Sequence, residues 1–292
     1  MFDPREKLKG TGAAPSAEAE IAAPETVEYR DDAQSRSLRP DAWAKAARGQ
    51  NFILDFAEGQ TPFELAWKDT LGYVVIGVDD ESVIEVHLDA AQVTLQGRGV
   101  VTVPPGVSTV RSVRGGRAAR MFPAASQPAC ELAANADSYA ESHPRVTTVA
   151  PDRGEVSKLK AFALADFPNT EGRFGSIFRT ETLMINFLDD QQGPRDSEKL
   201  SPHHHDDFEQ GSFTVDGSWL HHIRTPWTKQ MSRWRDDLAI EVWDETLTII
   251  PPPTVHTSRA VGEGRNRMID LFSPARSDFE EQGWVLNAED YR

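Results

Sequence analysis

Short apolar segments separated by turn residues dominate this chain from about residue 45 onward. Each segment is rich in β-branched or aromatic residues, and Gly, Asp or Pro stand between the segments at close spacing. The pattern is typical of an all-β sandwich or barrel, because no long amphipathic helix separates the segments. The expected strands are 51–56, 72–78, 82–88, 92–95 and 100–103, followed by 160–165, 176–178, 183–188, 211–215, 220–223, 238–243, 247–250 and 268–272.

The composition changes along the chain and divides it into five parts. The first part is rich in Ala, Glu, Pro and Ser, has few large apolar residues, and is predicted to be a flexible arm. Two β-rich domains follow, and the segment between them loses the strand pattern. The boundaries expected from these changes are 1–44 for the arm, 45–125 for the first domain, 126–160 for a linker with one short helix near 130–140, 161–280 for the second domain, and 281–292 for a polar tail.

The charge of the chain limits the partners that we expect. The formal net charge is −15 and the pI is about 5.0, so nucleic acid and anionic membrane surfaces would be repelled. Cys130 is the single cysteine, which excludes an intrachain disulfide and a thiolate metal cluster. There is no run of about 18 apolar residues that would span a bilayer. We therefore expect a cytoplasmic protein with a small-molecule substrate.

Histidines are concentrated in the second β-rich domain. His203, His204 and His205 are consecutive, and His256 follows a proline-rich turn. In an extended segment alternate side chains share a face, so His203 and His205 point the same way and His204 points oppositely. Two imidazoles on one face, joined by a third from elsewhere in the fold, are typical ligands of a divalent metal ion.

These residues resemble the motifs of the cupin superfamily. The first cupin motif is HxH, three or four residues, Glu, six residues, Gly, and here His203, His205 and Gly217 match it. The second is PxG, two residues, His. His256 takes the histidine position of this motif, while Pro253 stands where the glycine is expected. The resemblance implies a metal site made by His203, His205 and His256.

The fourth ligand position is left open between two neighbouring residues. Counting back six residues from Gly217 reaches Gln210, whereas the carboxylate, Glu209, stands one residue earlier. Strand alternation places Gln210 on the same face as Ser212 and Thr214, which favours Gln210. A β-bulge would exchange the two residues.

The first β-rich domain has a similar layout without the ligands. Aligned without gaps, Phe63 and Leu65 take the places of the paired histidines, and Thr70 takes that of Gln210. Downstream, the segment 104–109 matches the second motif with Thr109 in the histidine position. The resemblance thus implies a bicupin, with two tandem cupin (double-stranded β-helix, or jelly-roll) barrels, of which the first is degenerate and the second binds metal. Paired barrels of this kind also imply a homodimer.

The resemblance implies several functions for such a metal site. We favour an Fe(II) dioxygenase that cleaves a small anionic or enolisable substrate, because neutral histidine ligation with open positions suits iron. The alternatives are a cupin isomerase, lyase or decarboxylase that uses Mn, Ni or Zn, and a non-catalytic bicupin that binds a small molecule. The sequence contains no nucleophile-elbow, P-loop or dinucleotide motif.

Four further residues are candidates for substrate contacts. Ser212 and Thr214 share the inward face of their strand, Arg179 precedes the strand that leads to the histidines, and Arg224 begins a basic, aromatic loop at 223–235. This loop is expected either to rim the barrel mouth or to be a surface loop anchored by Trp packing. His221 and His222 have an open role, as contacts to the ligands or as ordinary packing residues.

Overall fold

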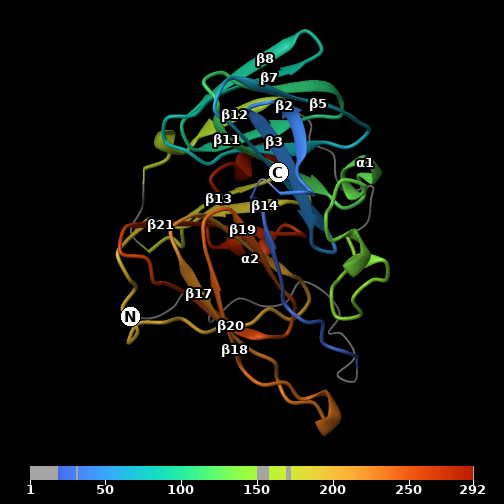
Figure 1. The fold of residues 1–292 in the computed structure, drawn as a ribbon, viewed down its shortest axis with the longest axis vertical. Helices are drawn as coiled ribbons and strands as arrows, with labels where there is room; N and C mark the ends of the chain where they lie inside the picture. Colours follow the sequence, from blue (N-terminus) through green and yellow to red (C-terminus); the bar gives the residue numbers. More distant parts are fainter. Residues whose placement is uncertain (1–18, 31, 150–157, 169–171, 292) are drawn as a thin grey trace.

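The computed structural model describes residues 19–30, 32–149, 158–168 and 172–291, and in this part of the chain strands far outnumber helices. The strands form two β-barrels that stack on one another, with the N-terminal barrel at the top of Figure 1 and the C-terminal barrel below it. Each barrel is built from one larger and one smaller antiparallel sheet. The all-β prediction is therefore correct, and residues 1–18 of the predicted arm lie outside the described residues.

The N-terminal barrel contains most of the first half of the chain. Its larger sheet has the order β12-β9-β6-β11-β4-β3-β2, and its smaller sheet has the order β5-β10-β7-β8. The strands are β2 (Arg36–Arg39), β3 (Ala42–Arg48), β4 (Phe52–Gly59), β5 (Phe63–Asp69), β6 (Tyr73–Gly77), β7 (Val83–Leu88), β8 (Ala91–Gln96), β9 (Gly99–Val103), β10 (Gly106–Ser112), β11 (Gly116–Pro123) and β12 (Lys160–Ala163).

The C-terminal barrel repeats this plan. Its larger sheet has the order β1-β19-β16-β21-β14-β13, with β15 also paired to β21, and its smaller sheet has the order β18-β17-β20. The strands are β1 (Glu25–Glu28), β13 (Ser176–Arg179), β14 (Met184–Phe187), β15 (Gln191–Gln192), β16 (Gln210–Asp216), β17 (Trp219–Arg224), β18 (Leu238–Val242), β19 (Thr246–Ile250), β20 (Val255–Ala260) and β21 (Arg265–Phe272).

The two barrels exchange strands, which changes the predicted domain boundaries. β1 comes from the N-terminal segment but pairs with β19 of the C-terminal barrel. β12, which precedes the C-terminal barrel in sequence, pairs with β9 of the N-terminal barrel. The described part of the arm predicted at 1–44 is therefore ordered β-structure. Sequence composition could not show this, because both strands are short and gain their partners from the opposite half of the chain.

A large apolar core lies between the barrels. On β4, Leu54 and Phe56 face this core, whereas Ile53 and Ala57 face the interior of their own barrel. Leu247 and Ile249 of β19 contribute from the other side. Because the larger sheets are covered on both faces, their strands are almost continuously buried. This contact makes the two barrels one packed unit.

Short helices occupy the linker and the end of the chain. The linker carries α1 (Gln127–Cys130) and η2 (Ala136–Tyr139), where one helix near 130–140 was predicted. The predicted polar tail instead packs on the C-terminal barrel, because Trp284 and Val285 join an apolar cluster and η6 (Ala288–Tyr291) follows them. The other helical turns are η4 (Leu164–Asp166), η5 (Met231–Arg233) and α2 (Ser277–Glu281). Among the described helices, none has the length and apolar character needed to cross a membrane.

In the described residues, a cluster of possible metal ligands occurs in the C-terminal barrel and not in the N-terminal barrel. Its interior is filled by apolar side chains and by an ion pair in which Arg120 Nε donates to Asp55 Oδ2 at 2.9 Å. Tyr73 Oη and Ser108 Oγ form a hydrogen bond of 2.8 Å near this pair. The degenerate barrel expected from the sequence is therefore present.

The strand registers correct the residue-level alignment of the two barrels. Tyr73 opposes the last residue of β9 as Gln210 opposes the last residue of β19, so Tyr73 corresponds to Gln210. The pair Trp67–Ser108 then corresponds to the bridge between His203 and His256. The gap-free alignment had matched Phe63, Leu65, Thr70 and Thr109 to the ligand positions. It is out of register, because the loops between the paired strands of the two barrels differ in length.

Candidate metal centre

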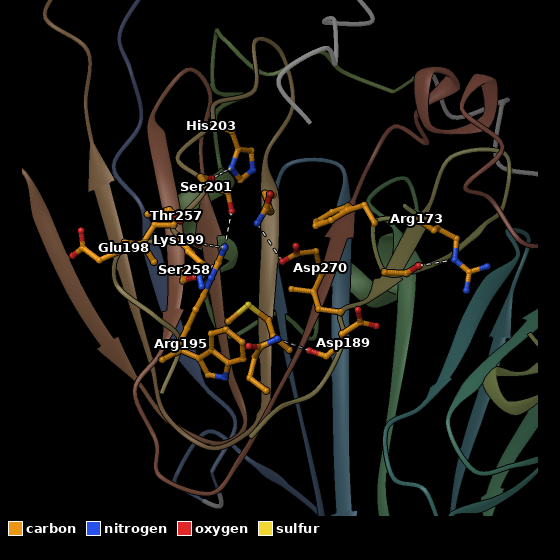
Figure 2. A pocket seen from close by; sticks show the side chains of 18 residues that line it. Arg173, Asp189, Arg195, Glu198, Lys199, Ser201, His203, Thr257, Ser258 and Asp270 are labelled. Atoms are coloured by element: carbon orange, nitrogen blue, oxygen red, sulfur yellow. Dashed lines mark hydrogen bonds between the residues drawn. The ribbon is translucent and has the colours of Figure 1, made fainter. Parts of the chain in front are cut away.

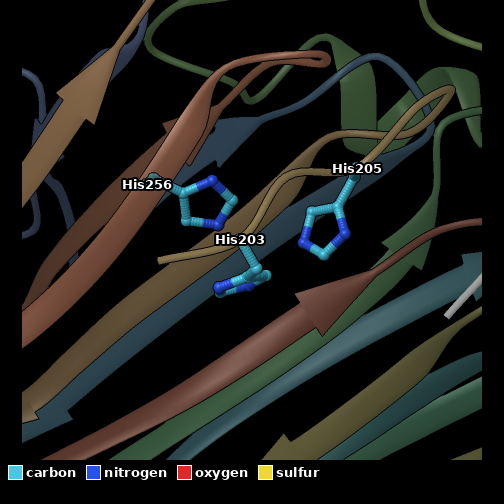
Figure 3. A group of neighbouring side chains, drawn as sticks. All are labelled: His203, His205 and His256. Atoms are coloured by element: carbon cyan, nitrogen blue, oxygen red, sulfur yellow. The ribbon is translucent and has the colours of Figure 1, made fainter. Parts of the chain in front are cut away.

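The structure brings three histidines together at one end of the C-terminal barrel. His203 and His256 form an antiparallel bridge, with N···O distances of 3.0 and 2.8 Å, so the segment carrying His203 lies directly beside β20. The ring centroids of His203 and His205 are 4.4 and 5.3 Å from that of His256. One ligand nitrogen from each ring lies within 4.8 Å of the other two. Figure 3 shows the three rings facing a common space.

Backbone carbonyls orient two of these rings. His203 Nδ1 donates to Ser201 O at 3.0 Å, and His256 Nδ1 donates to Thr254 O at 3.1 Å. In a neutral imidazole, a proton on Nδ1 leaves the lone pair on Nε2. Both rings are thus set to offer Nε2 to a metal. Burial, with the nearby His256 and His203, holds the pKa of His205 well below its usual value, which keeps that ring neutral.

Gln210 lies beside the triad. Its Oε1 is 2.9 Å from His205 Nε2 and 3.4 Å from His256 Nε2. Its Nε2 donates to Ser212 Oγ at 2.9 Å and to Asp270 Oδ1 at 3.2 Å. Because a carboxylate only accepts hydrogen bonds when ionised, the amide nitrogen must face Asp270 and the oxygen must face the imidazoles. This arrangement matches the strand alternation that favoured Gln210.

Glu209 points to the opposite side of β16. Its carboxylate accepts a hydrogen bond of 2.6 Å from the backbone N–H of Gln50 and one of 3.1 Å from His143 Nδ1. Tyr139 Oη donates to the same carboxylate at 3.3 Å. Glu209 therefore joins the metal-bearing strand to the linker and to the N-terminal barrel, and it does not face the triad.

The pair between His143 and Glu209 predicts a pH-dependent contribution to stability. The hydrogen bond that His143 donates to Glu209 raises the pKa of His143, so the folded state favours the charged imidazole. Such stability is fully present below the unfolded pKa of about 6.5 and is lost as the pH rises through the folded pKa. The melting temperature of the parent should therefore exceed that of His143→Gln most clearly near pH 6, and the two should converge toward pH 9 in thermal melts. A difference that stays constant with pH would contradict this.

A buried aromatic and cationic stack supports His205. The ring of Phe208 lies 4.2 Å from that of His205 at an interplanar angle of 30°. The guanidinium of Arg276 lies 4.4 Å from the centre of the Phe208 ring. Arg276 Nε also donates to Asp278 Oδ1 at 2.9 Å. Because Arg276 is almost wholly buried, this stack limits the rotation of His205.

Arg195 holds the segment that carries His203 against β20. Its Nη2 donates to Lys199 O at 2.8 Å and to Ser201 Oγ at 3.0 Å, and its Nη1 donates to Ser258 O at 3.2 Å. Ser201 is also the residue whose carbonyl orients His203. The planar guanidinium makes contacts in a fixed geometry that a lysine does not reproduce. Arg195 is thus a positioning residue for the triad.

We expect Arg195→Lys to weaken metal binding without removing any ligand. Loss of a hydrogen bond that orients a ligand typically lowers metal affinity by about 10–100-fold. The affinity would be measured by competition with a chelator. Arg224→Lys is the matched control, because Arg224 is exposed and pairs with Asp237 on the far loop. Equal affinities for both variants would show that Arg195 does not position His203.

A cavity of about 820 Å³ opens beside the triad and enters the barrel. His203 and Gln210 line it, together with Asp270, Ser258 and Trp219. Figure 2 shows His203 and Asp270 facing this space from opposite walls, with Arg195 below His203. The exposed side chains of Asp189, Glu198 and Lys199 lie at its outer part. The cavity therefore connects solvent to His203 of the triad and to Gln210 beside it.

Two of the four predicted substrate contacts lie away from this cavity. Arg179 forms an ion pair with Glu280, and its backbone N–H donates to Asn287 Oδ1 at 2.9 Å. Arg224 pairs with Asp237 and is largely exposed at the base of the loop 225–237, which projects from the barrel in Figure 1. Neither residue lines the cavity, because sequence proximity to a ligand strand does not specify the side of the sheet on which a long side chain ends. No residue of the loop 225–237 lines the cavity either.

The other two predicted contacts face the barrel interior. Ser212 Oγ donates to Asp270 Oδ1 at 2.8 Å, one contact away from the cavity. Thr214 is buried further along β16 and, like Ser212, is not among the residues that line the cavity. Both therefore support the lining rather than form it.

The remaining histidines divide between surface and interior. His204 is exposed near Asp206, as the alternation predicts. His221 is buried, and its Nδ1 is 2.8 Å from Ser258 Oγ. Burial lowers the pKa of His221 to about 3, with smaller effects from His256 and His222, so this ring is neutral at ordinary pH. His221 thus orients the Ser258 hydroxyl at the cavity wall.

Sequence reasoning missed Asp270, which the structure places next to Gln210. Asp270 is buried on β21 between Met268 and Phe272, and these three alternate residues all face the barrel interior. The available signal was a carboxylate in the otherwise apolar segment 268–272. Its closeness to the triad depends on the pairing of β21 with β16, which local sequence does not reveal.

The chain has the bicupin fold, that is, two tandem barrels of the cupin type. No family model matches the sequence, and no curated protein matches it. Among solved structures, the chain is similar to Lactobacillus farciminis oxalate decarboxylase in a formate complex, with a TM-score of 0.59 and 13% identity, over 90% of this chain and 89% of that one. It is also similar to a mutant of Bacillus subtilis oxalate decarboxylase, with a TM-score of 0.58 and 10% identity, over 90% and 80% of the two chains. At such identities the likeness shows the fold alone.

Proposed function

We propose that the C-terminal barrel is the active site of a metal-dependent enzyme of the decarboxylase, lyase or isomerase type, acting on a small carboxylic acid. The observation that carries this proposal is the position of Asp270. Gln210 contacts the triad through Oε1 and Asp270 through Nε2, so a single amide group separates the metal-binding atoms from a buried carboxylate in the same cavity.

The residues of the triad fit a divalent metal ion. His203, His205 and His256 supply neutral nitrogen donors, and Gln210 supplies an amide oxygen. Mn, Fe, Ni and Zn all accept such ligands. A metal held there would act as a Lewis acid that binds and polarises a substrate carboxylate. Because Gln210 is neutral, the donor set leaves the charge of the ion to be balanced by an anionic substrate.

Asp270 is the group that we assign to proton transfer. Ser212 Oγ and Gln210 Nε2 both donate to its Oδ1, which favours the ionised carboxylate. An ionised Asp270 would remove a proton from C2 of a 2-hydroxy acid, or from C3 of a 2-oxo acid, in an isomerase or lyase. In a decarboxylase, Asp270 would first take up a proton from solvent and then give it to the carbon that CO₂ has left. Both reactions need one proton at one carbon, which a single buried carboxylate can transfer.

The structural comparisons favour this proposal over the Fe(II) dioxygenase expected from the sequence. The similar proteins are named as decarboxylases, and nothing in the comparisons supports iron or dioxygenase chemistry. The chain's own residues add a proton-transfer group beside the triad, which oxygen-dependent cleavage does not by itself require. The homodimer, the cytoplasmic location and the absence of nucleic-acid and membrane partners remain predictions.

The test is to identify the metal and the gas that is produced or consumed. Protein purified without a histidine tag would be loaded anaerobically with Mn(II), Fe(II), Ni(II) or Zn(II), and each form would be incubated with small 2-oxo, 2-hydroxy and dicarboxylic acids. We expect CO₂ release or a rearranged acid without oxygen uptake. Oxygen consumption in step with product, in the iron form alone, would support the dioxygenase instead. Turnover that is equal with and without metal would contradict both.

A further inference from the structure

The cavity of the C-terminal barrel is arranged in layers along its strands. On β21, the inward residues Phe272, Asp270 and Met268 lie two residues apart, and successive residues of this kind are separated by about 7 Å. The first layer contains the triad and Gln210. Asp270 and Ser258 belong to the second layer, which is polar.

The third layer lies further from the triad along β21, and an apolar cluster surrounds Met268 there. Met268 and Trp219 are almost wholly buried there, and they pack in one cluster with Ala260 and, on its edge, Leu188. Met268, Trp219 and Leu188 also line the cavity. The backbone N–H of Leu188 donates to Met268 O at 3.2 Å, so this wall is part of the sheet and not a loose loop. The cavity therefore passes from metal-binding atoms, through a polar layer, to an apolar wall.

The volume of the cavity exceeds what a minimal dicarboxylate fills. A two-carbon dicarboxylate has six non-hydrogen atoms and displaces roughly the volume of three to four water molecules, about 100 Å³. The cavity measures about 820 Å³. The path from the first layer to the third is about 14 Å along β21, which such a small anion cannot span. A substrate that uses all three layers needs a body behind its acidic head.

We infer that the site takes a 2-oxo or 2-hydroxy acid with an aromatic or branched aliphatic side chain, an inference that rests on the proposed function. The carboxylate and the adjacent oxygen face the triad and Gln210. The carbon that gains or loses the proton, which is C2 in a 2-hydroxy acid and C3 in a 2-oxo acid, lies in the layer of Asp270. The side chain packs against Leu188, Trp219 and Met268. The N-terminal barrel has no comparable space, because apolar side chains such as Val75, Val101 and Phe122 fill its interior.

The test uses acids with one common head and side chains of increasing size. Binding of pyruvate, 4-methyl-2-oxopentanoate and phenylpyruvate, with oxalate as the reference, would be measured by calorimetry. Each methylene buried in an apolar site improves affinity by about fourfold. We therefore expect phenylpyruvate to bind at least about tenfold more tightly than pyruvate or oxalate. Equal affinities across the series, or tightest binding of oxalate, would overturn the inference.

A pair of matched variants localises the effect to the third layer. Leu188→Asn keeps the number of side-chain non-hydrogen atoms but makes this wall polar, and it should remove most of the gain from pyruvate to phenylpyruvate. Leu238→Asn is the control, because Leu238 is 40% exposed and does not line the cavity. A thermal melt of each variant verifies that it is folded. If phenylpyruvate binds equally well to both variants, its side chain does not occupy this layer.

Measuring the series with and without metal separates this inference from the proposed function. If both are right, removing the metal weakens every acid by a similar factor, while the increase in affinity with side-chain size persists. If removing the metal leaves the affinities unchanged but affinity still increases with side-chain size, the apolar layer is supported and the metal-dependent function is contradicted. A strong metal effect with no dependence on side-chain size supports the function and overturns the substrate class.

Discussion

His256→Ala should lower the bound metal from about one equivalent per chain to a small fraction of that value, and turnover should fall with it. His256 is the histidine that joins the other two, since it bridges to His203 through the backbone and its ring lies close to both. Its loss leaves two imidazoles and an amide oxygen. Loss of a hydrogen bond that orients a ligand lowers metal affinity by about 10–100-fold. We expect the metal affinity of His256→Ala to fall by more than this, because the ligand itself is removed.

His204→Ala is the matched control for this experiment. It removes an imidazole next to the triad in sequence, but His204 is exposed and lies near Asp206. Elemental analysis of both variants, purified without a tag, should show metal retained in His204→Ala and lost in His256→Ala. Equal retention in the two variants would show that the metal, if any, is bound elsewhere. A melting temperature for each variant distinguishes loss of metal from loss of the fold.

The second large effect is expected for Asp270→Asn, which should lower turnover strongly while the metal stays bound. The amide has nearly the shape of the carboxylate and still accepts a hydrogen bond from Ser212 or Gln210, so the lining is preserved. It cannot take up a proton from the substrate carbon. General acid–base groups contribute about 10²–10⁴-fold to a rate, and kcat should fall within this range.

Asp207→Asn serves as the control for the charge change. Asp207 is also a buried carboxylate of the same barrel, but its contacts are with Thr147, outside the cavity. It should keep both metal and turnover. If Asp270→Asn keeps full activity in the presence of bound metal, another group moves the proton and the assignment of Asp270 is wrong. Loss of metal from Asp270→Asn would instead show that Asp270 acts by holding Gln210.

The sequence by itself was sufficient to predict the class of fold and the faces of its key strands. Alternation along an extended chain is a local property, so the common side of His203 and His205, the opposite direction of His204, and the inward direction of Gln210 could be predicted without knowing the partner strands. The turn after β16 was also predictable, because Gly217 has a φ of +83°, which favours glycine, and a Cβ there would lie 2.3 Å from Asn266 Oδ1.

Only the tertiary structure decided which strands are paired and which side chains surround the triad. β1 and β12 cross between the barrels, and the internal alignment of the two barrels shifts because their loops differ. The position of Asp270 beside Gln210 depends on the pairing of β21 with β16, across about sixty residues. Such contacts are determined by the packing of the whole barrel, to which every strand contributes. Short-range residue patterns therefore predicted the cluster of three histidines, whereas its neighbours Asp270 and Arg195 became visible only in the folded chain.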